Sequence, residues 1–367
     1  MAKITLLNIL ADTGGDQRLE IDDRKFTVLA GPAGSGKTGV LRAIAGLEQR
    51  TRGEILIGEK KVDDLTPSER KVAMVFSEDA LYPGMSVREN IAFGLKRRSF
   101  SESEMSRRVQ DAAAALSITE LLDRKPSELS VVDRQRTSIA RAIARQPEVI
   151  LFDEPLARFD AATRARLRAD LRQLHQRLET TFVYATRDPA EAMALGEQVI
   201  ILHDGRVEQH DATAVVYRAP ANLFVAGFFG APPMNFISGR LKLERETVLF
   251  RESGEGTIEA RLPIADFPAL AERNGQEIAL GVRPEDIGII QAAKGAEPEN
   301  SFPVLVDFIE TAGAETTFHL QTGAHSIVAR RLASAESEPA GRRVRCQFDL
   351  NRIQFFDSGT GQRVVER

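Results

Sequence analysis

Residues 31–38 read GPAGSGKT, which fits the phosphate-binding pattern G-x-x-x-x-G-K-[ST] at every fixed position. Its glycines permit backbone conformations and close approaches that other residues do not, so successive N–H groups can surround a phosphate. Lys37 would then neutralise the β and γ phosphates of a nucleotide, and the Thr38 hydroxyl would hold Mg²⁺. The open alternative is a glycine-rich turn that matches by accident. The candidate phosphate loop consists of Gly31, Pro32, Ala33, Gly34, Ser35, Gly36, Lys37 and Thr38.

The flanking sequence agrees with a phosphate loop. Residues 26–30 form a short apolar run suited to a buried strand, and residues 40–45 suit a helix. A helix that begins at the loop presents its N-terminus, with free N–H groups, to an anion.

A second candidate lies far downstream, where the apolar run 149–152 ends in Asp153-Glu154-Pro155. The run predicts a buried strand, and strand ends are where such sheets carry their chemistry. At that end Asp153 would orient Mg²⁺ through its water shell. Glu154 would accept the proton of a water molecule that attacks the γ phosphate.

The composition describes an ordinary globular protein of two or three domains. The chain has 367 residues, of which 43% are hydrophobic and 28% charged. A net charge of -4 argues against a nucleic-acid-binding surface. No apolar run approaches the roughly 20 residues that span a bilayer. Cys346 is the only cysteine, which excludes an internal disulfide or a thiolate metal cluster, and we expect it to be half-buried in a strand.

The order and spacing of these motifs resemble the ATP-binding subunits of ABC importers, in the branch that transports carbohydrates, polyols and glycerol phosphate. The resemblance covers nearly the whole chain. It lies, besides the two motifs above, in residues 75–76 (Val-Phe), 80–83 (Ala-Leu-Tyr-Pro), 129–130 (Leu-Ser), 191–193 (Glu-Ala-Met), 224–228 (Phe-Val-Ala-Gly-Phe), 234–236 (Met-Asn-Phe) and 281–285 (Gly-Val-Arg-Pro-Glu).

The resemblance implies that two ATPase subunits close on two ATP molecules, each bound with Mg²⁺. It also implies two transmembrane permease subunits, an external solute-binding protein and a peripheral location at the cytoplasmic face of the inner membrane. The family's docking region for the permease corresponds to residues 80–83. We expect no nucleic-acid partner. The solute, a sugar, polyol or glycerol derivative, is selected by the other subunits.

The sequence departs from the family pattern at two motifs that lie close to the γ phosphate in the family. The family has Gln after the Val-Phe strand, where it contacts Mg²⁺ and the attacking water; here Ser77 is too short for that reach. The family signature Leu-Ser-Gly-Gly-Gln is replaced by LSVVD at residues 129–133. Ser130 is retained, but valine adds bulk where N–H groups must approach the partner's γ phosphate, and Asp133 adds negative charge there. In the alternative interpretation, Asp133 only stabilises a helix N-terminus.

Two further departures concern the γ phosphate and the base. Arg187 stands where the family has His, and an Arg donates hydrogen bonds but accepts none. It could still bind the γ phosphate by its charge. The N-terminal segment 8–14 offers no aromatic side chain to stack on adenine.

Because each ATP in this family lies between one subunit's phosphate loop and the other's signature, these departures affect both sites. We therefore favour pairing with a second, more complete ATPase subunit over a homodimer. Alternative functions are a catalytically impaired nucleotide-binding scaffold beside an active partner, and a cytosolic ABC protein unconnected with transport. The catalytic candidates are Glu154, Arg187 and Ser77.

The sequence predicts an α/β P-loop NTPase domain over residues 1–230, followed by an all-β sandwich or barrel over 231–367. The resemblance implies that this second domain is a regulatory domain of the OB and TOBE type. Residues 88–145 are mainly helical by periodicity, most clearly 101–116 and 131–145. Leucines recur at helical spacing over 161–179. The C-terminal part has strand-like runs separated by Gly, Pro and charged turns, and the resemblance implies that this domain pairs the ATPase subunits. The runs are 240–250, 257–262, 277–290, 304–309, 316–321, 326–331 and 343–356.

Overall fold

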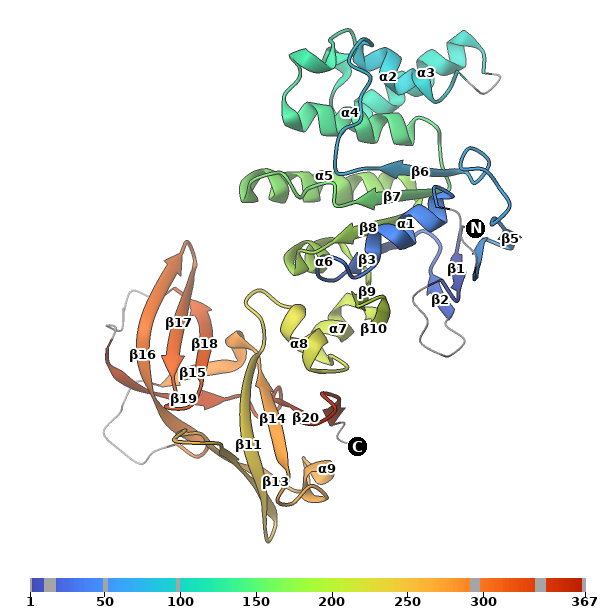
Figure 1. Cartoon of the computed structure of the whole chain (residues 1–367). Helices are drawn as coiled ribbons and strands as arrows, with labels where there is room; N and C mark the ends of the chain where they lie inside the picture. The colour runs from blue at the N-terminus through green and yellow to red at the C-terminus, as the bar shows by residue number, and fades with distance from the viewer. Residues whose placement is uncertain are drawn as a thin grey trace. The chain divides into compact units, whose positions relative to one another are not determined.

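A mostly parallel sheet forms the centre of the first of two units in this computed structural model (Figure 1). The structure describes residues 2–9, 18–48, 52–96, 100–290, 298–333 and 341–364. The two units are Met1–Thr213 and Ala214–Arg367. The sequence places the boundary after residue 230. In the structure the segment between the two positions bonds to the C-terminal unit, since Leu223 donates its N–H to Gly361 O.

The strand order of the central sheet is β10-β9-β3-β8-β7-β6, and only β10 runs antiparallel to its neighbour. Every residue of β3 and β8 is buried, as expected for central strands covered on both faces. The strands are β3 (Phe26–Ala30), β6 (Val72–Val75), β7 (Val149–Asp153), β8 (Thr181–Thr186), β9 (Gln198–His203) and β10 (Arg206–Ala212).

Helices α1 (Lys37–Ala45), α5 (Ala161–Leu178) and α6 (Pro189–Leu195) accompany this sheet. Helix α5 buries Leu167, Leu171 and Leu174, which confirms the amphipathic helix predicted over 161–179. A small antiparallel sheet completes the unit. Its strands, in the order β2-β1-β4-β5, are β2 (Arg18–Ile21), β1 (Ile4–Leu7), β4 (Glu54–Ile57) and β5 (Lys60–Lys61).

The predicted helical region lies beyond β6 in Figure 1 and consists of α2 (Val87–Phe93), α3 (Glu102–Ala115) and α4 (Val131–Ile143), with short 3₁₀ turns at Thr119–Leu121 and Pro126–Glu128. Each of the three α-helices begins at a serine whose hydroxyl accepts a backbone N–H three residues on. The caps are Ser86, Ser101 and Ser130. Capping of this kind explains why the helices begin where they do.

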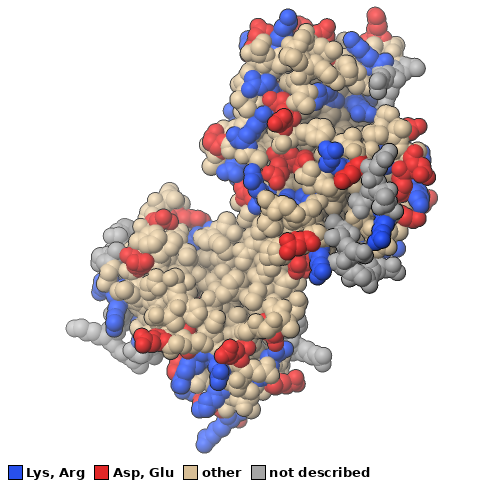
Figure 2. Space-filling model, in the orientation of Figure 1, with Lys and Arg blue, Asp and Glu red and all other residues tan. Residues whose placement is uncertain are grey.

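The C-terminal unit contains two antiparallel sheets whose buried faces share one apolar core. One has the order β13-β12-β11-β14-β20-β21 and the other β15-β19-β16-β17-β18. Figure 2 shows a broad area of this unit that carries no charged side chains. The strands are β11 (Asn235–Glu244), β12 (Thr247–Glu252), β13 (Glu259–Pro263), β14 (Glu277–Val282), β15 (Ile287–Ile290), β16 (Ser301–Ala312), β17 (Glu315–Gln321), β18 (Ser326–Leu332), β19 (Arg343–Phe348), β20 (Gln354–Asp357) and β21 (Arg363–Val364). Short helices α7 (Thr213–Arg218), α8 (Leu223–Phe228) and α9 (Pro268–Ala271) and a 3₁₀ turn (Pro284–Asp286) accompany them.

Three of the predicted strand runs are wrong as single strands. The run 240–250 turns at Arg245, whose φ of 47° closes a hairpin, and 277–290 is interrupted by the 3₁₀ turn at Pro284. The run 343–356 breaks between β19 and β20. The sequence does not reveal these turns, because the residues before and after each turn are apolar and face the same core. The expectation for Cys346 is also wrong, since this side chain is fully buried in β19.

A buried hydrogen-bonded cluster supports the end of β8, close to the candidate site residues that follow it. Tyr184 Oη donates to Glu191 Oε2 at 2.8 Å, and Thr186 Oγ1 donates to the same oxygen at 2.7 Å. Burial raises the pKa of Tyr184 well above its ordinary value, and the Glu191 charge adds to this rise. The phenol therefore stays a donor, and it holds α6 to β8 through a carboxylate that is 2% exposed.

We expect Tyr184→Phe to lower the free energy of unfolding by about 1.5–3 kcal/mol, because Glu191 loses a donor that it cannot replace with water. The measurement is urea unfolding followed by circular dichroism. Tyr82→Phe is the matched control in the same unit, since Tyr82 is 41% exposed, and it should change stability by less than about 0.5 kcal/mol. Equal effects of the two substitutions would contradict the cluster's role.

Candidate functional site

The predicted phosphate loop connects the end of β3 to the start of α1. A Cβ atom at Gly31 would lie 2.1 Å from Leu202 O, so only glycine fits there. Gly34 and Gly36 have φ values of 79° and 97°, which favour glycine. No side chain caps the N-terminus of α1, so its first N–H groups stay available to an anion.

Lys37 lies under the loop and is only 4% exposed. Its Nζ donates to Gly31 O and Pro32 O, both at 2.8 Å, and to Ser35 Oγ at 3.3 Å. Burial lowers the pKa of Lys37, while the charges of Glu154 and Asp153 act in the opposite direction. The loop carbonyls thus hold a cation in the middle of the cradle.

The two predicted Mg²⁺ residues lie in direct contact. Thr38 Oγ1 donates to Asp153 Oδ1 at 2.9 Å, although the residues are 115 positions apart in the sequence. Strand β7 is buried along its length and opens only at Asp153, its last residue. Mg²⁺ prefers hard oxygen ligands such as hydroxyl and carboxylate, so this pair fits the ion.

Glu154 and Arg187 are also in contact, which the sequence pattern does not predict. Glu154 has a φ of 44°, and its N–H donates to Ala185 O at 3.1 Å, which fixes the turn after β7. Arg187 follows β8, and its Nε lies 3.3 Å from Glu154 Oε2. The Arg187 side chain is 60% exposed and the Glu154 side chain 25%, so both remain accessible to a ligand. The candidate base therefore has a guanidinium beside it.

The Leu-Ser-Val-Val-Asp signature forms the start of α4, and its polar groups bond to each other. Ser130 Oγ accepts the N–H of Asp133 at 3.1 Å and donates to Asp133 Oδ2 at 2.7 Å. Val131 is 42% exposed in the first turn. The structure thus matches the interpretation of Asp133 as a residue that stabilises the helix N-terminus, and it commits the Ser130 hydroxyl to that carboxylate.

The remaining predicted site residues lie apart from this group. Ser77 is exposed in the loop after β6, and no described contact joins it to the phosphate loop. Ser130 bonds only within its own helical turn in the described contacts. Of the segment expected near adenine, residues 10–14 lie outside the described part of the chain.

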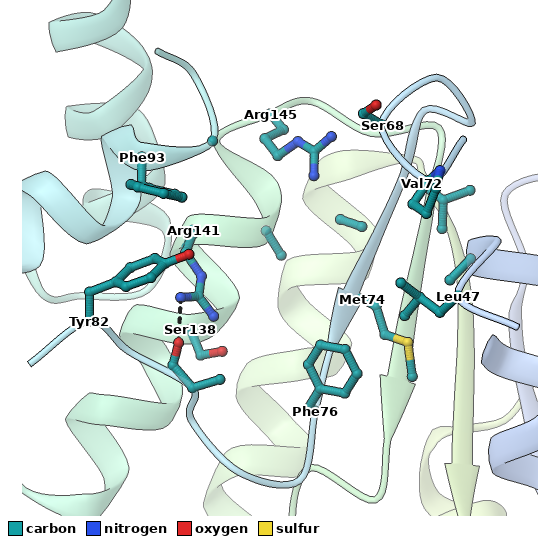
Figure 3. Close-up of a pocket in the computed structure, with 16 residues that line it drawn as sticks. Leu47, Ser68, Val72, Met74, Phe76, Tyr82, Phe93, Ser138, Arg141 and Arg145 are labelled. Atoms are coloured by element: carbon teal, nitrogen blue, oxygen red, sulfur yellow. Dashed lines mark hydrogen bonds between the residues drawn. The ribbon is translucent and has the colours of Figure 1, made fainter. Parts of the chain in front are cut away.

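A cleft of about 900 Å³ lies between β6 and the helical region, beside the predicted docking segment 80–83 (Figure 3). Tyr82 and Phe93 pack against each other at its edge, with ring centroids 4.3 Å apart and ring planes inclined by 42°, and both side chains are partly exposed. Asn90 is fully buried and shapes the segment: its Oδ1 accepts the N–H of Tyr82, and its Nδ2 donates to Tyr82 O. The sequence did not point to Asn90, for which the one signal is an uncharged amide immediately before the apolar run Ile91-Ala92-Phe93.

Comparisons with known proteins agree with this geometry. A model of the ABC transporter family matches residues 15–157, a model of the MalK OB fold domain matches 230–287, and a model of the TOBE domain matches 280–356. The chain is 41% identical over 346 residues to the sn-glycerol-3-phosphate import ATP-binding protein of Escherichia coli K12, which covers 94% of this chain and 93% of that protein. The chain belongs to the ABC transporter ATP-binding family. The protein of the same name from Yersinia pseudotuberculosis is 40% identical over 346 residues, with 94% and 93% covered.

A solved structure supports the fold of the first unit. It is cbiO1 of Clostridium perfringens, described as part of the ABC transporter complex cbiONQ, and it matches with a TM-score of 0.53 at 22% identity. The match covers 57% of this chain and 88% of that one. The predicted fold class is confirmed: an ABC-type P-loop domain is followed by OB and TOBE modules.

We expect Lys37→Ala to weaken ATP binding by about 10- to 100-fold, because a hydrogen bond to a charged group is worth about 1.5–3 kcal/mol. Titration calorimetry of the purified chain measures the affinity. Lys71→Ala is the control: Lys71 is exposed and pairs with Glu148 on the surface at 2.6 Å, so its loss should leave ATP affinity unchanged. Parent-like affinity of Lys37→Ala would show that the phosphate-loop assignment is wrong.

Proposed function

We propose that this protein is the ATP-binding and hydrolysing subunit of an importer for a small polar solute of the glycerol-phosphate, polyol or sugar class. The observation that carries the proposal is the contact between Thr38 and Asp153, because it joins the end of the phosphate loop to the strand that presents Glu154. The relatives named above, which are import ATP-binding proteins for sn-glycerol 3-phosphate, support the solute class.

In this proposal the phosphate loop and Lys37 bind the phosphates of ATP, and Thr38 and Asp153 hold Mg²⁺. A Mg²⁺ ion held there would neutralise charge on the phosphate oxygens, which favours attack of water on the γ phosphorus with ADP as the leaving group. Glu154 accepts the proton of that water molecule. Ser130 of one subunit faces the phosphates bound by the other.

Arg187 has two partners available in this mechanism. Before ATP binds, the Arg187 guanidinium lies beside Glu154. When ATP is bound, the guanidinium can turn to the γ phosphate, which is a stronger anion, because Arg187 is largely exposed. While Arg187 pairs with Glu154 it competes with the attacking water for the same carboxylate oxygen. Arg187 thus favours nucleotide binding and slows the proton transfer.

The permease partner is proposed to dock at the cleft between β6 and the helical region. A cleft with two partly exposed aromatic rings, Tyr82 and Phe93, beside half-buried Arg141 suits an amphipathic helix of another subunit. Among the described residues, no helix is long and apolar enough to cross a membrane. On the likeness to import ATP-binding proteins, the proposed assembly has this chain at the cytoplasmic face of the inner membrane, on two permease subunits served by an external solute-binding protein.

The proposal extends to a mixed pair of ATPase subunits. Val131, Val132 and Asp133 occupy the turn that must approach the partner's γ phosphate, and the Ser130 hydroxyl is bonded to Asp133. A partner with glycines in that turn would complete the site on Lys37, whereas a second copy of this chain would not. The OB and TOBE modules offer exposed apolar side chains for subunit pairing, namely Leu305, Phe308 and Leu332.

A second candidate function is a nucleotide-binding scaffold beside an active partner. Two contacts favour it: the Arg187–Glu154 ion pair at the base and the Ser130–Asp133 bond at the signature. The turnover of the purified chain separates the two functions.

We expect the purified chain to hydrolyse ATP below about 0.1 s⁻¹, since loss of one preorganised contact costs a factor of about 10²–10³ from typical turnover of about 10 s⁻¹. The rate of phosphate release measures this turnover. Glu154→Gln should abolish the residual activity. Glu179→Gln, at an exposed pair with Arg24, should not change it. Fast turnover that Glu154→Gln abolishes would contradict the impairment and leave the ATPase assignment intact.

We expect the native mass of the transporter to show one copy of this chain and one different ATPase subunit. The triple substitution Val131→Gly, Val132→Gly and Asp133→Gln should then improve ATP binding at the partner's phosphate loop, because it removes branched bulk and charge from the facing turn. ATP binding at the site that contains Lys37 should change little. Two copies of this chain without a second ATPase would contradict the mixed pair.

A further inference from the structure

Asp79 joins three segments of the N-terminal unit at one carboxylate. It lies two residues after Ser77, and its side chain is 12% exposed. Arg134 of α4 donates from Nε to Asp79 Oδ2 at 3.1 Å. Arg158, from the loop after Glu154, forms an ion pair through Nη2 with Asp79 Oδ1.

Arg158 is held rigidly relative to the candidate base. The turn after Glu154 is closed by two backbone bonds, from Ala157 N to Glu154 O and from Phe159 N to Leu156 O, both at 3.2 Å. Leu156 is fully buried and anchors the turn in the core. These backbone bonds and the buried Leu156 hold the backbone of Arg158 in a defined place relative to Glu154, so a displacement of the turn also displaces Arg158.

The guanidinium of Arg158 also bonds to the signature helix. Its Nη2 donates to Gln135 Oε1 at 3.2 Å, and Gln135 is fully buried in α4. Together with Arg134, this contact ties α4 and the loop after Glu154 to the same carboxylate.

The backbone around Asp79 leads directly to the proposed docking segment. Arg141 of α4 donates from Nη1 to Ala80 O at 2.7 Å, the bond drawn in Figure 3, and from Nη2 to Asp79 O at 3.3 Å. Ala80 has a φ of 44°, so this turn has a single well-defined shape. Two residues further on, Tyr82 is fixed by Asn90 at the edge of the cleft.

The burial of the Asp79 carboxylate strengthens its two ion pairs. A largely buried carboxylate between two guanidinium groups strongly resists separation, because removal of one partner leaves an uncompensated charge out of water. An exposed ion pair contributes little by comparison. We therefore expect a movement of the loop after Glu154 to displace Asp79 through Arg158.

We propose that Asp79 is a positioning residue that couples the phosphate site to the docking cleft, through Arg158 on one side and the segment 79–82 on the other. Its position two residues from Ser77 gives the chain a route between the two sites that needs no long side chain at residue 77. The proposal rests on the proposed function, since it assumes that ATP binds at the phosphate loop.

The test is amide hydrogen exchange of the full-length chain with and without ATP and Mg²⁺, with ATP affinity measured on the same samples. In the parent, nucleotide should change the exchange of residues 79–86 by at least severalfold. Asp79→Asn should keep ATP affinity within about threefold, because Lys37 and Thr38 are untouched, and lose most of that change. Asp79→Glu, which keeps the charge, should retain it.

A double-mutant cycle identifies the partner. Arg158→Gln should lose the same exchange response as Asp79→Asn, and the double variant should lose no more than either single one. Asp170→Asn is the matched control, because Asp170 pairs with Arg136 of α4 at 2.6 Å and tethers that helix without touching residue 79. Its response should equal the parent's. If Asp79→Asn does not fold, Arg158→Gln and its comparison with Asp170→Asn decide the matter.

The outcomes separate the two proposals. A parent chain that does not bind ATP overturns the proposed function, and the coupling falls with it. A parent that binds ATP, together with an Asp79→Asn variant that responds as the parent does, overturns the coupling alone. Loss of the response in Asp170→Asn to the same extent as in Arg158→Gln would show that general loosening of α4, not the Asp79 contact, is responsible.

Discussion

The hydrogen bond between Thr38 and Asp153 is the contact on which the rest of the site depends. It requires β3 and β7 to end at the same edge of the sheet, with β8 between them, and the parallel pairing of all three strands ensures this. The same edge brings Glu154 and Arg187 together, because they follow β7 and β8. A site assembled in this way depends on strand register, since a shift of one residue would reverse the direction in which each side chain points.

The unusual residues of this chain are bonded to close neighbours. Arg187 pairs with Glu154, and Ser130 Oγ accepts the N–H of Asp133 and donates to its carboxylate. Each substitution is thereby stabilised within the isolated subunit, at the expense of groups that the family uses for a ligand. This arrangement explains how a chain can keep the fold and the phosphate loop of an ABC ATPase while it changes the surroundings of the nucleotide.

Arginines connect the helical region to the loop that follows β6. Arg134 and Arg141 both extend from α4 to the loop that follows β6, and Arg158 reaches the same loop from the other side. Guanidinium groups suit this role because several donors in a fixed plane can hold carboxylate and carbonyl oxygens at once. These bonds tie the helical region to the edge of the sheet.

The OB and TOBE type of the C-terminal part followed from the family resemblance. The sequence by itself determined the phosphate loop, the Asp153-Glu154 strand end, the helical region and the strand-rich character of the C-terminal part. These depend on local patterns: glycine positions, an apolar run before a carboxylate, and helical or alternating periodicity. It could not predict that Arg187 pairs with Glu154, that Asp79 lies between Arg134 and Arg158, or that three apolar runs of the C-terminal unit contain turns. Such contacts join residues far apart in the chain, and their partners are chosen by strand order and helix packing. Charge and spacing along one sequence do not encode that choice, because many arginines are equally able to pair with a given carboxylate until the tertiary structure brings one of them within reach.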